Sequence, residues 1–223
     1  MVNQNNILPR VLPFAIYILF LALSDYLSPL SNILSLGSLT IDTKWLYTLR
    51  VVLVLSVLLF FFRSYSELKV VPAAKTFLVA ILAGLLVFMA WILPYPAWAG
   101  VNNHAQLSSA GQDAVWMASR LIGAAIIVPV MEELFWRSLV MRWIDDKNFL
   151  NFSPSNVSVL ALMISSGVFA SAHQLWLAGL FAGIIYGALY IKYKNLWVPI
   201  VAHAVTNGVL GVWVMCTGNW QYW

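Results

Sequence analysis

Charged residues are scarce in this 223-residue chain, where Asp, Glu, Lys and Arg together make up 9%. A soluble globular domain is roughly a quarter charged and about half apolar, whereas 62% of this sequence is hydrophobic. The composition therefore excludes an ordinary soluble protein and indicates an integral membrane protein. The formal net charge of +4 comes from a few residues in short segments, so the chain lacks the basic patch that nucleic-acid binding requires.

Cysteine is almost absent as well, since Cys216 is the only one. A single cysteine excludes an internal disulfide framework and a two-cysteine redox motif. Cys216 also lacks a charged or imidazole neighbour in the sequence that would activate it as a nucleophile. Ser165, Ser166 and Ser171 lie near His173, but no G-x-S-x-G turn surrounds them. The sequence thus argues against thiol and serine nucleophiles.

The alternation of apolar and polar residues that a membrane β-barrel needs is also missing. Long apolar runs are present instead, and several can cross a hydrocarbon core of ~30 Å as a helix. We therefore expect an all-α fold, a polytopic transmembrane helix bundle of about eight helices, with seven as the alternative. The first run is too long for a signal-peptide core, which predicts an uncleaved first membrane helix. The apolar windows lie at about residues 11–30, 45–62, 76–93, 114–128, 130–144, 157–173, 176–191 and 196–215.

The number of spans depends on residues 114–144, which form either one helix or two helices divided near Pro129. A single helix gives seven spans and collects the basic residues on one side of the membrane, as the positive-inside rule favours. Two helices give eight spans with both termini in the cytoplasm. The second helix could begin at Pro129, because proline is well tolerated at the first position of a helix. Glu132 and His173 then share a depth, which favours eight spans. The basic residues concerned are Arg10, Arg63, Lys69, Lys75, Arg142, Lys147, Lys192 and Lys194.

Ionisable side chains inside the apolar windows are the main functional signal. Each buried charge costs at least about 2.5–3.5 kcal/mol in a bilayer, so several of them need mutual pairing or a watery cavity. Residues four apart share one face of a helix, so Glu133 is expected to pair with Arg137. By the same spacing His203 and Asn207 point into one space, while Glu132 is left without an obvious cation.

Three separate helices thus offer groups that are used in acid–base chemistry. A carboxylate held without a cation in an apolar pocket is a competent proton acceptor and donor near neutral pH, so Glu132 is a candidate general base. His173, one turn after Phe169, could share the same water molecule. His203 and Asn207 could donate hydrogen bonds to an oxyanion as it forms. This set fits the attack of water on an amide bond.

Simpler structural interpretations exist for each polar residue. A single histidine in a membrane helix is often a packing residue that is hydrogen-bonded to a neighbouring helix. The pair Glu133–Arg137 can serve as structural support alone. Asp25 and Arg120 are expected to be structural or helix-end residues, and Arg50 is expected to extend its charge toward the interface.

Two other function classes would use the same residues. Glu132, His173 and His203 form a set that zinc accepts in catalytic sites, although the H-E-x-x-H motif is missing and no further Cys or Asp completes a shell. A transporter would use them as a proton relay, but no repeat symmetry between the two halves is visible. A membrane chaperone or an immunity protein that binds a peptide without cutting it belongs to this non-catalytic class. For the leading hypothesis, water attack without metal, no cofactor is expected.

Three motifs, in this order and on separate predicted membrane helices, resemble the motif series of the CPBP intramembrane proteases. This family comprises the type II CAAX prenyl endopeptidases and their bacterial relatives, and the resemblance covers roughly residues 114–215. The motifs are Glu132-Glu133-x-x-x-Arg137, Phe169-x-x-x-His173 and His203-x-x-x-Asn207.

The resemblance implies a glutamate-dependent intramembrane endopeptidase without a covalent intermediate. Carried over to this chain, the resemblance implies that Glu132 activates water and that His173 assists this step. It assigns the binding of the oxyanion to His203 and Asn207. The residues implied to support the site are Glu133, Arg137 and Phe169.

The substrate that the resemblance implies is a membrane-associated protein or peptide, with lipid modification as one option. Eukaryotic members cut prenylated CAAX tails, and bacterial members are associated with bacteriocin maturation or immunity. The expected partners are this substrate and the lipid bilayer, and no nucleic acid. The expected location is the bacterial inner (cytoplasmic) membrane. We expect residues 111–223 to form the catalytic membrane core and residues 1–110 to form membrane helices of unassigned role.

Overall fold

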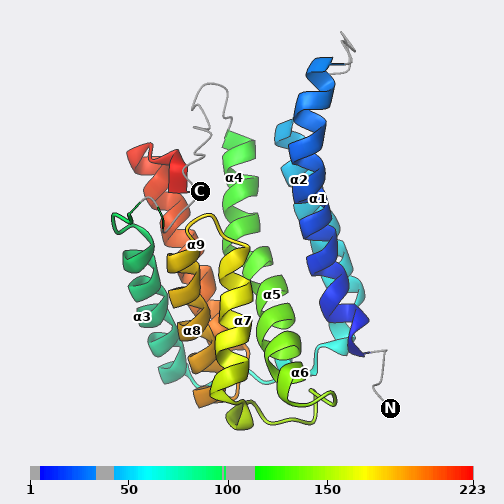
Figure 1. Ribbon diagram of the computed structural model, residues 1–223, viewed down its shortest axis with the longest axis vertical. Helices are drawn as coiled ribbons and strands as arrows, with labels where there is room; N and C mark the ends of the chain where they lie inside the picture. Colours follow the sequence, from blue (N-terminus) through cyan, green and yellow to red (C-terminus); the bar gives the residue numbers. More distant parts are fainter. Residues whose placement is uncertain (1–5, 34–42, 97, 99–113, 223) are drawn as a thin grey trace.

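The fold is a bundle of helices, seen in a computed structural model that describes residues 6–33, 43–96, 98 and 114–222, apart from the side chains of 24–33 and 43–45. This part of the chain contains no strand, and its seven helices of 13 residues or more alternate in direction (Figure 1). The prediction of an all-α polytopic bundle is confirmed. The long helices are α1 (Leu8–Ile33), α2 (Thr43–Phe60), α3 (Ala74–Trp91), a continuous helix Ala114–Asp145, α7 (Val159–Ser171), α8 (Trp176–Tyr193) and α9 (Trp197–Thr217).

Four of these helices are long and apolar enough to cross a membrane. They are Ala74–Trp91, Ala114–Asp145, Trp176–Tyr193 and Trp197–Thr217. Three shorter apolar helical stretches, Leu8–Leu23, Leu46–Phe60 and Val159–Ser171, run beside them. Many of their leucine, isoleucine and valine side chains are exposed on the bundle surface, where hydrocarbon chains of lipid can cover them. The chain is therefore an integral membrane protein.

The preferred interpretation, two helices divided near Pro129, is wrong, and the alternative of seven long helices describes this part of the chain. The helix from Ala114 to Asp145 runs unbroken through α4 (Ala114–Ile122), α5 (Val128–Glu133) and α6 (Arg142–Asp145), with π-helical turns between them. Proline in a helix normally crowds the carbonyl four residues before it. Here that carbonyl belongs to Ala125, inside the π-turn Gly123–Ile127, whose wider ring accommodates the proline. The start of α1 and the end of α9 therefore lie at opposite ends of the bundle (Figure 1).

Glu132 and His173 nevertheless lie at a similar height, for a reason that the sequence did not reveal. The helix Ala114–Asp145 has 32 residues, so it is ~48 Å long and exceeds the thickness of a hydrocarbon core. Glu132 lies 13 residues before Asp145, which is ~20 Å from that end of the bundle. Helix α7 begins at the same end and spans only ~20 Å, so His173, just beyond it, reaches the same height.

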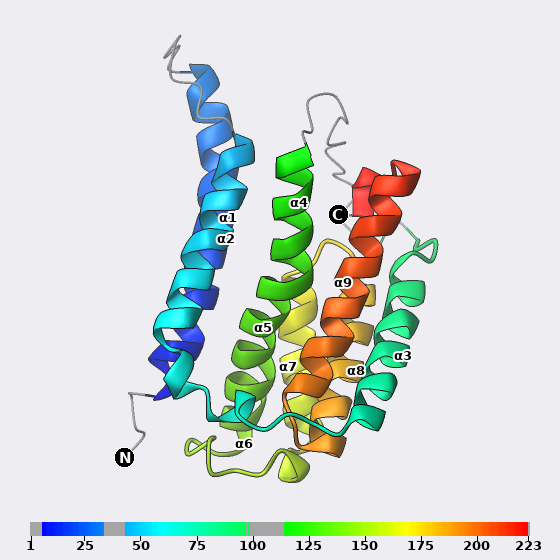
Figure 2. The same cartoon turned by 180° about the vertical axis from the view of Figure 1, so that it is seen from behind.

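The central helix Ala114–Asp145 separates two groups of helices. Helices α1 and α2 pack along each other on one side, and α3, α8 and α9 pack together on the other side (Figure 2). The pair α3 and α9 approaches closely because Gly84 faces the backbone of Ala202, where a Cβ atom would collide with the carbonyl oxygen. The hydroxyl of Thr206 donates to the carbonyl of Gly84 at 2.8 Å, which fixes α9 against α3.

The end of the bundle that carries the N-terminus is basic and is held together by a buried carboxylate. The eight basic residues of the seven-span interpretation lie in elements that begin or end there (Figure 1). Glu67, in the α2–α3 connection, accepts from Arg10 Nη2 at 2.6 Å and from Arg142 Nη2 at 3.2 Å. The hydroxyl of Ser138 also donates to Glu67. This cluster ties the start of α1, the α2–α3 connection and the end of the central helix together.

Candidate active site

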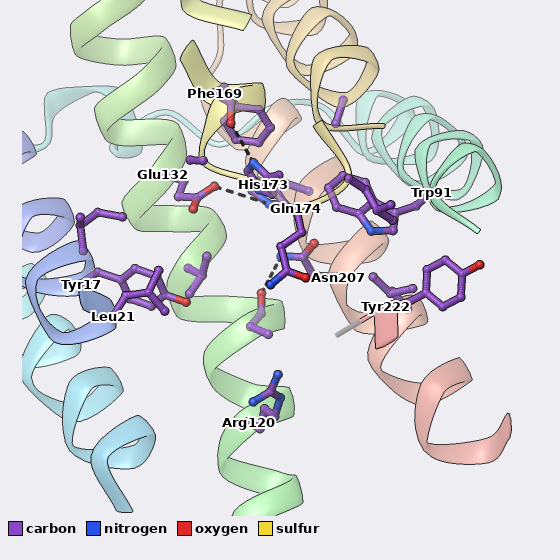
Figure 3. A pocket seen from close by; sticks show the side chains of 18 of the residues that line it. Tyr17, Leu21, Trp91, Arg120, Glu132, Phe169, His173, Gln174, Asn207 and Tyr222 are labelled. Atoms are coloured by element: carbon purple, nitrogen blue, oxygen red, sulfur yellow. Dashed lines mark hydrogen bonds and ion pairs between the residues drawn. The ribbon is translucent and has the colours of Figure 1, made fainter. Parts of the chain in front are cut away.

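The structure brings the candidate catalytic residues to one cavity of about 470 Å³. Glu132 from the central helix, His173 from the α7–α8 turn, and His203 and Asn207 from α9 all line it. Figure 3 shows the carboxylate of Glu132 directed toward the turn that carries His173, with Asn207 on the same side of the central helix. Side chains that are 71 positions apart in the sequence, from Glu132 to His203, thus meet inside the bundle.

The two adjacent glutamates point in different directions because successive residues of a helix are rotated by ~100°. Glu132 lines the cavity, whereas Glu133 is fully buried behind it, against α9. Oε2 of Glu132 is buried and has no hydrogen-bond partner among the residues that the structure describes. A buried carboxylate oxygen without a donor is uncommon in proteins, and a water molecule or a substrate in the cavity could supply the missing hydrogen bond.

Glu133 links Arg137 and His203. Its Oε2 lies 3.1 Å from Arg137 Nε, as the spacing of four residues predicts, and its Oε1 lies 2.9 Å from His203 Nδ1. An ion-paired carboxylate only accepts hydrogen bonds, so His203 donates from Nδ1. The ring of Tyr186 stacks on the His203 imidazole at 4.9 Å with an interplanar angle of 21°, which fixes its orientation further.

The other nitrogen of His203 faces the free glutamate. Nε2 of His203 lies 4.0 Å from Oε2 of Glu132. This separation is too long for a direct hydrogen bond, but a water molecule at about 2.8 Å from each atom would contact both. The geometry therefore provides a place for one water between an acid group and an imidazole.

His173 is oriented from the opposite side. Its Nδ1 lies 2.8 Å from the carbonyl oxygen of Phe169, which can only accept, so Nδ1 carries the proton. In the neutral ring Nε2 is then an acceptor, available to the cavity that His173 lines. The ring of Trp91 lies edge-on to the imidazole at 5.6 Å and limits its rotation.

Asn207 is positioned by the irregular part of the central helix. Its Nδ2 donates to the carbonyl of Ala124 at 2.9 Å, and Ala124 lies in the π-turn Gly123–Ile127. Such turns recur at functional sites because they displace backbone groups from the regular ladder. The amide of Asn207 keeps a second N–H for a ligand in the cavity.

Phe169 and Arg137 pack against each other below the site. The guanidinium carbon of Arg137 lies 4.5 Å from the centre of the Phe169 ring, and Nη2 donates to the Gly183 carbonyl at 3.4 Å. The ring of Phe169 thus packs against Arg137, the cation of the ion pair with Glu133. Its carbonyl accepts the hydrogen bond that orients His173.

The zinc alternative finds little support in this arrangement. Within the described part of the chain, no three His, Cys, Asp or Glu side chains are grouped closely enough to hold a metal ion. Glu132, His173 and His203 therefore do not fit a zinc site as they stand.

Several residues that line the cavity carried no functional signal in the sequence. Tyr17 from α1, Arg50 from α2 and Trp91 from α3 belong to the N-terminal part, which matches no motif. Only the charge of Arg50 inside an apolar window could have indicated a role. The expected boundary between residues 1–110 and 111–223 lies outside the described residues, as does the side chain of Asp25.

Comparison with known proteins gives one family. Residues 114–209 match the family model described as type II CAAX prenyl endopeptidase Rce1-like. No curated protein and no solved structure matches the chain. The matched segment contains all three motifs and every catalytic candidate of the cavity, and the family is one of peptide-bond hydrolases. The resemblance is confirmed: residues 114–209 match the Rce1-like family of type II CAAX prenyl endopeptidases.

Proposed function

We propose that this protein is an intramembrane endopeptidase that hydrolyses a peptide bond by glutamate-activated water. The observation that carries the proposal is the carboxylate of Glu132, which is buried, has an unpartnered oxygen, and lies 4.0 Å from the imidazole of His203. Both groups line a cavity large enough for a segment of peptide.

In the proposed mechanism a water molecule beside Glu132 also contacts His173, and the carbonyl oxygen of the substrate takes the position next to Nε2 of His203. Glu132 takes one proton from this water while its oxygen attacks the carbonyl carbon of the substrate. Nε2 of His173 accepts the second hydrogen as a hydrogen bond and aims the oxygen. The tetrahedral intermediate then collapses, the C–N bond breaks, and the proton on Glu132 moves to the amine that leaves.

The negative charge that develops on the carbonyl oxygen needs donors in an apolar site, where each is worth more than in water. We assign this role to Nε2–H of His203 and to the second Nδ2–H of Asn207. His203 already donates from Nδ1, so donation from Nε2 requires the doubly protonated ring. Glu133 accepts the hydrogen bond from Nδ1 at 2.9 Å, which leaves Nε2 for the cavity that His203 lines.

For the substrate we propose the C-terminal region of a membrane-associated protein or peptide, with a prenyl or other lipid group as a candidate feature. The family description names CAAX prenyl endopeptidases, and the cavity lies within apolar helices. The positive-inside rule would place the basic N-terminal end of the bundle in the cytoplasm, in keeping with the bacterial inner membrane as the location.

The test compares cells that express the parent protein with cells that express Glu132→Gln, by mapping new N-termini in membrane proteins with mass spectrometry. We expect a set of new termini that the parent produces and the variant does not. Asp146→Asn, in an exposed loop, is the matched control and should behave as the parent. If no terminus depends on Glu132, the hydrolase proposal is wrong and a peptide-binding or transport role gains support.

A further inference from the structure

The cavity contains a cationic region that the proposed hydrolysis does not use. Two arginines, Arg50 and Arg120, line it, whereas Glu132 is the only Asp or Glu among the lining residues that the structure describes. Among these described lining residues, arginines thus outnumber carboxylates in a space surrounded by apolar helices. A buried charge in a membrane protein is costly unless a ligand or a counter-charge compensates it.

Arg50 is the better defined of the two. It is 7% exposed and thus lies within the protein, instead of extending to the interface as the sequence suggested. Its guanidinium carbon lies 4.2 Å from the ring centre of Tyr17 and 4.8 Å from that of Tyr47. Aromatic faces attract a cation but do not accept its hydrogen bonds in the plane. Accordingly, Nε of Arg50 is buried without a hydrogen-bond partner in the described part of the chain.

Arg120, which belongs to the central helix, also contacts Tyr47. Its guanidinium carbon is 5.5 Å from the ring centre of Tyr47, and the hydroxyl of Tyr47 donates to the Arg120 carbonyl at 3.1 Å. Tyr47 therefore holds both arginines in one region. Figure 3 shows Arg120 on the same helix as Glu132, with Asn207 between their heights.

The spacing along the central helix limits how far a ligand must reach. Arg120 and Glu132 are 12 residues apart, which corresponds to ~18 Å of helix. An extended peptide advances ~3.3–3.6 Å per residue. A peptide whose scissile bond lies at Glu132 would therefore present a group to the arginines within about five residues of that bond.

We propose that Arg50 and Arg120 form an anion subsite that binds a carboxylate of the peptide substrate within about five residues of the scissile bond. This inference rests on the proposed peptide hydrolysis and adds a determinant of specificity to it. Guanidinium groups bind carboxylates with paired, charge-assisted hydrogen bonds, which an apolar site strengthens. The carboxylate can come from the C-terminus of the substrate or from an acidic side chain.

The experiment measures binding to purified Glu132→Gln protein in detergent, so that no probe is cut. The probes are peptides of four to seven residues with uncharged side chains that begin with S-farnesylcysteine, each made as a free acid and as a C-terminal amide. A third series of amides carries glutamate at the last position. We expect one peptide length at which the acid binds about tenfold more tightly than the amide. If the amide with a terminal glutamate binds as tightly as the free acid, an acidic side chain can supply the carboxylate. If it binds as weakly as the other amides, the carboxylate comes from the C-terminus.

Arg50→Gln, added to Glu132→Gln, should reduce the difference between acid and amide to less than about twofold while it leaves amide binding unchanged. Unchanged amide binding shows that the variant is folded. Arg63→Gln, which removes the same charge from an exposed position, should keep the full difference. Equal binding of acid and amide at every length, or a preference that survives Arg50→Gln, would overturn the subsite. Since nothing is hydrolysed in this measurement, its result is independent of the test of Glu132.

Discussion

Nδ1 of His203 lies 2.9 Å from Oε1 of Glu133, the glutamate that does not line the cavity. Through this contact the second glutamate of the pair determines which nitrogen of the imidazole faces the first. Glu133 is itself held by Arg137 at 3.1 Å. A chain of three buried groups therefore orients the catalytic candidate, and each link makes a separate prediction.

Glu133→Ala should lower both stability and rate. It leaves the guanidinium of Arg137 buried without its carboxylate, which typically costs about 3–5 kcal/mol. It also leaves Nδ1 of His203 without its acceptor. Thermal unfolding in detergent should report the loss of stability, and a cleavage assay should report the loss of rate.

Glu133→Ala combined with Arg137→Met separates the two effects. The double variant removes both charges, so its unfolding temperature should return most of the way to that of the parent. Its rate should stay low, because His203 is still without Glu133. A double variant that recovers activity together with stability would show that Glu133 only balances the charge of Arg137.

Glu132→Gln should lower the rate by at least about 100-fold and should not lower the unfolding temperature. The expectation of unchanged or higher stability follows from Oε2 of Glu132, which is buried without a partner in the parent. Removing a charge from such a position relieves a cost of burial. A variant that cuts at the parental rate would remove Glu132 from the mechanism.

Asn207→Ala should lower kcat by about 100- to 1,000-fold with little change in KM, as removal of an oxyanion donor does. The substitution also removes the hydrogen bond from Nδ2 to the Ala124 carbonyl. Asn207→Asp serves as a second variant, since its carboxylate has nearly the same shape but cannot donate. A kcat that stays at the parental value in both variants would contradict the assigned role.

Part of this site could be predicted from the sequence because it depends on local helical geometry. A rotation of ~100° per residue separates Glu132 from Glu133, and a spacing of four residues pairs Glu133 with Arg137. The structure reproduces both relationships. The bond between Glu133 and His203 could not be predicted, because it depends on how α9 packs against the central helix.

The preferred prediction of eight spans was wrong for a related reason. Pro129 and the shared height of Glu132 and His173 favoured a break, since regular helices of membrane length were assumed. The structure instead uses a central helix longer than the membrane core, with a π-turn before Pro129, and a short α7. Neither π-turns nor helix length beyond the apolar window has a clear sequence signal, whereas the distribution of basic residues favoured the observed seven helices.

Removal of metal ions should leave activity unchanged. Cleavage by the purified protein should continue in the presence of 1,10-phenanthroline, and metal analysis should find no stoichiometric zinc. The reason is the donor set, because no three His, Cys, Asp or Glu side chains among the described residues are grouped closely enough to hold a metal ion. Inhibition that added zinc reverses would restore the metalloprotease alternative.

Stability should depend on Glu67 at acid pH. Burial by itself raises the pKa of this carboxyl, but hydrogen bonds and the charge of Arg10, with a hydrogen bond from Ser138, lower it below its usual range. A carboxyl whose pKa is lower in the folded protein stabilises the fold above its unfolded value of about 4.3, and this contribution is lost as the pH falls through the folded value. At pH values below about 4.3, the unfolding temperature of the parent in detergent should therefore decrease. Glu67→Gln should be less stable than the parent at pH 7, because Arg10 and Arg142 lose their counter-charge, and its curve should be flatter in the acid range. Parallel curves for the two proteins would show that Glu67 does not anchor this end of the bundle.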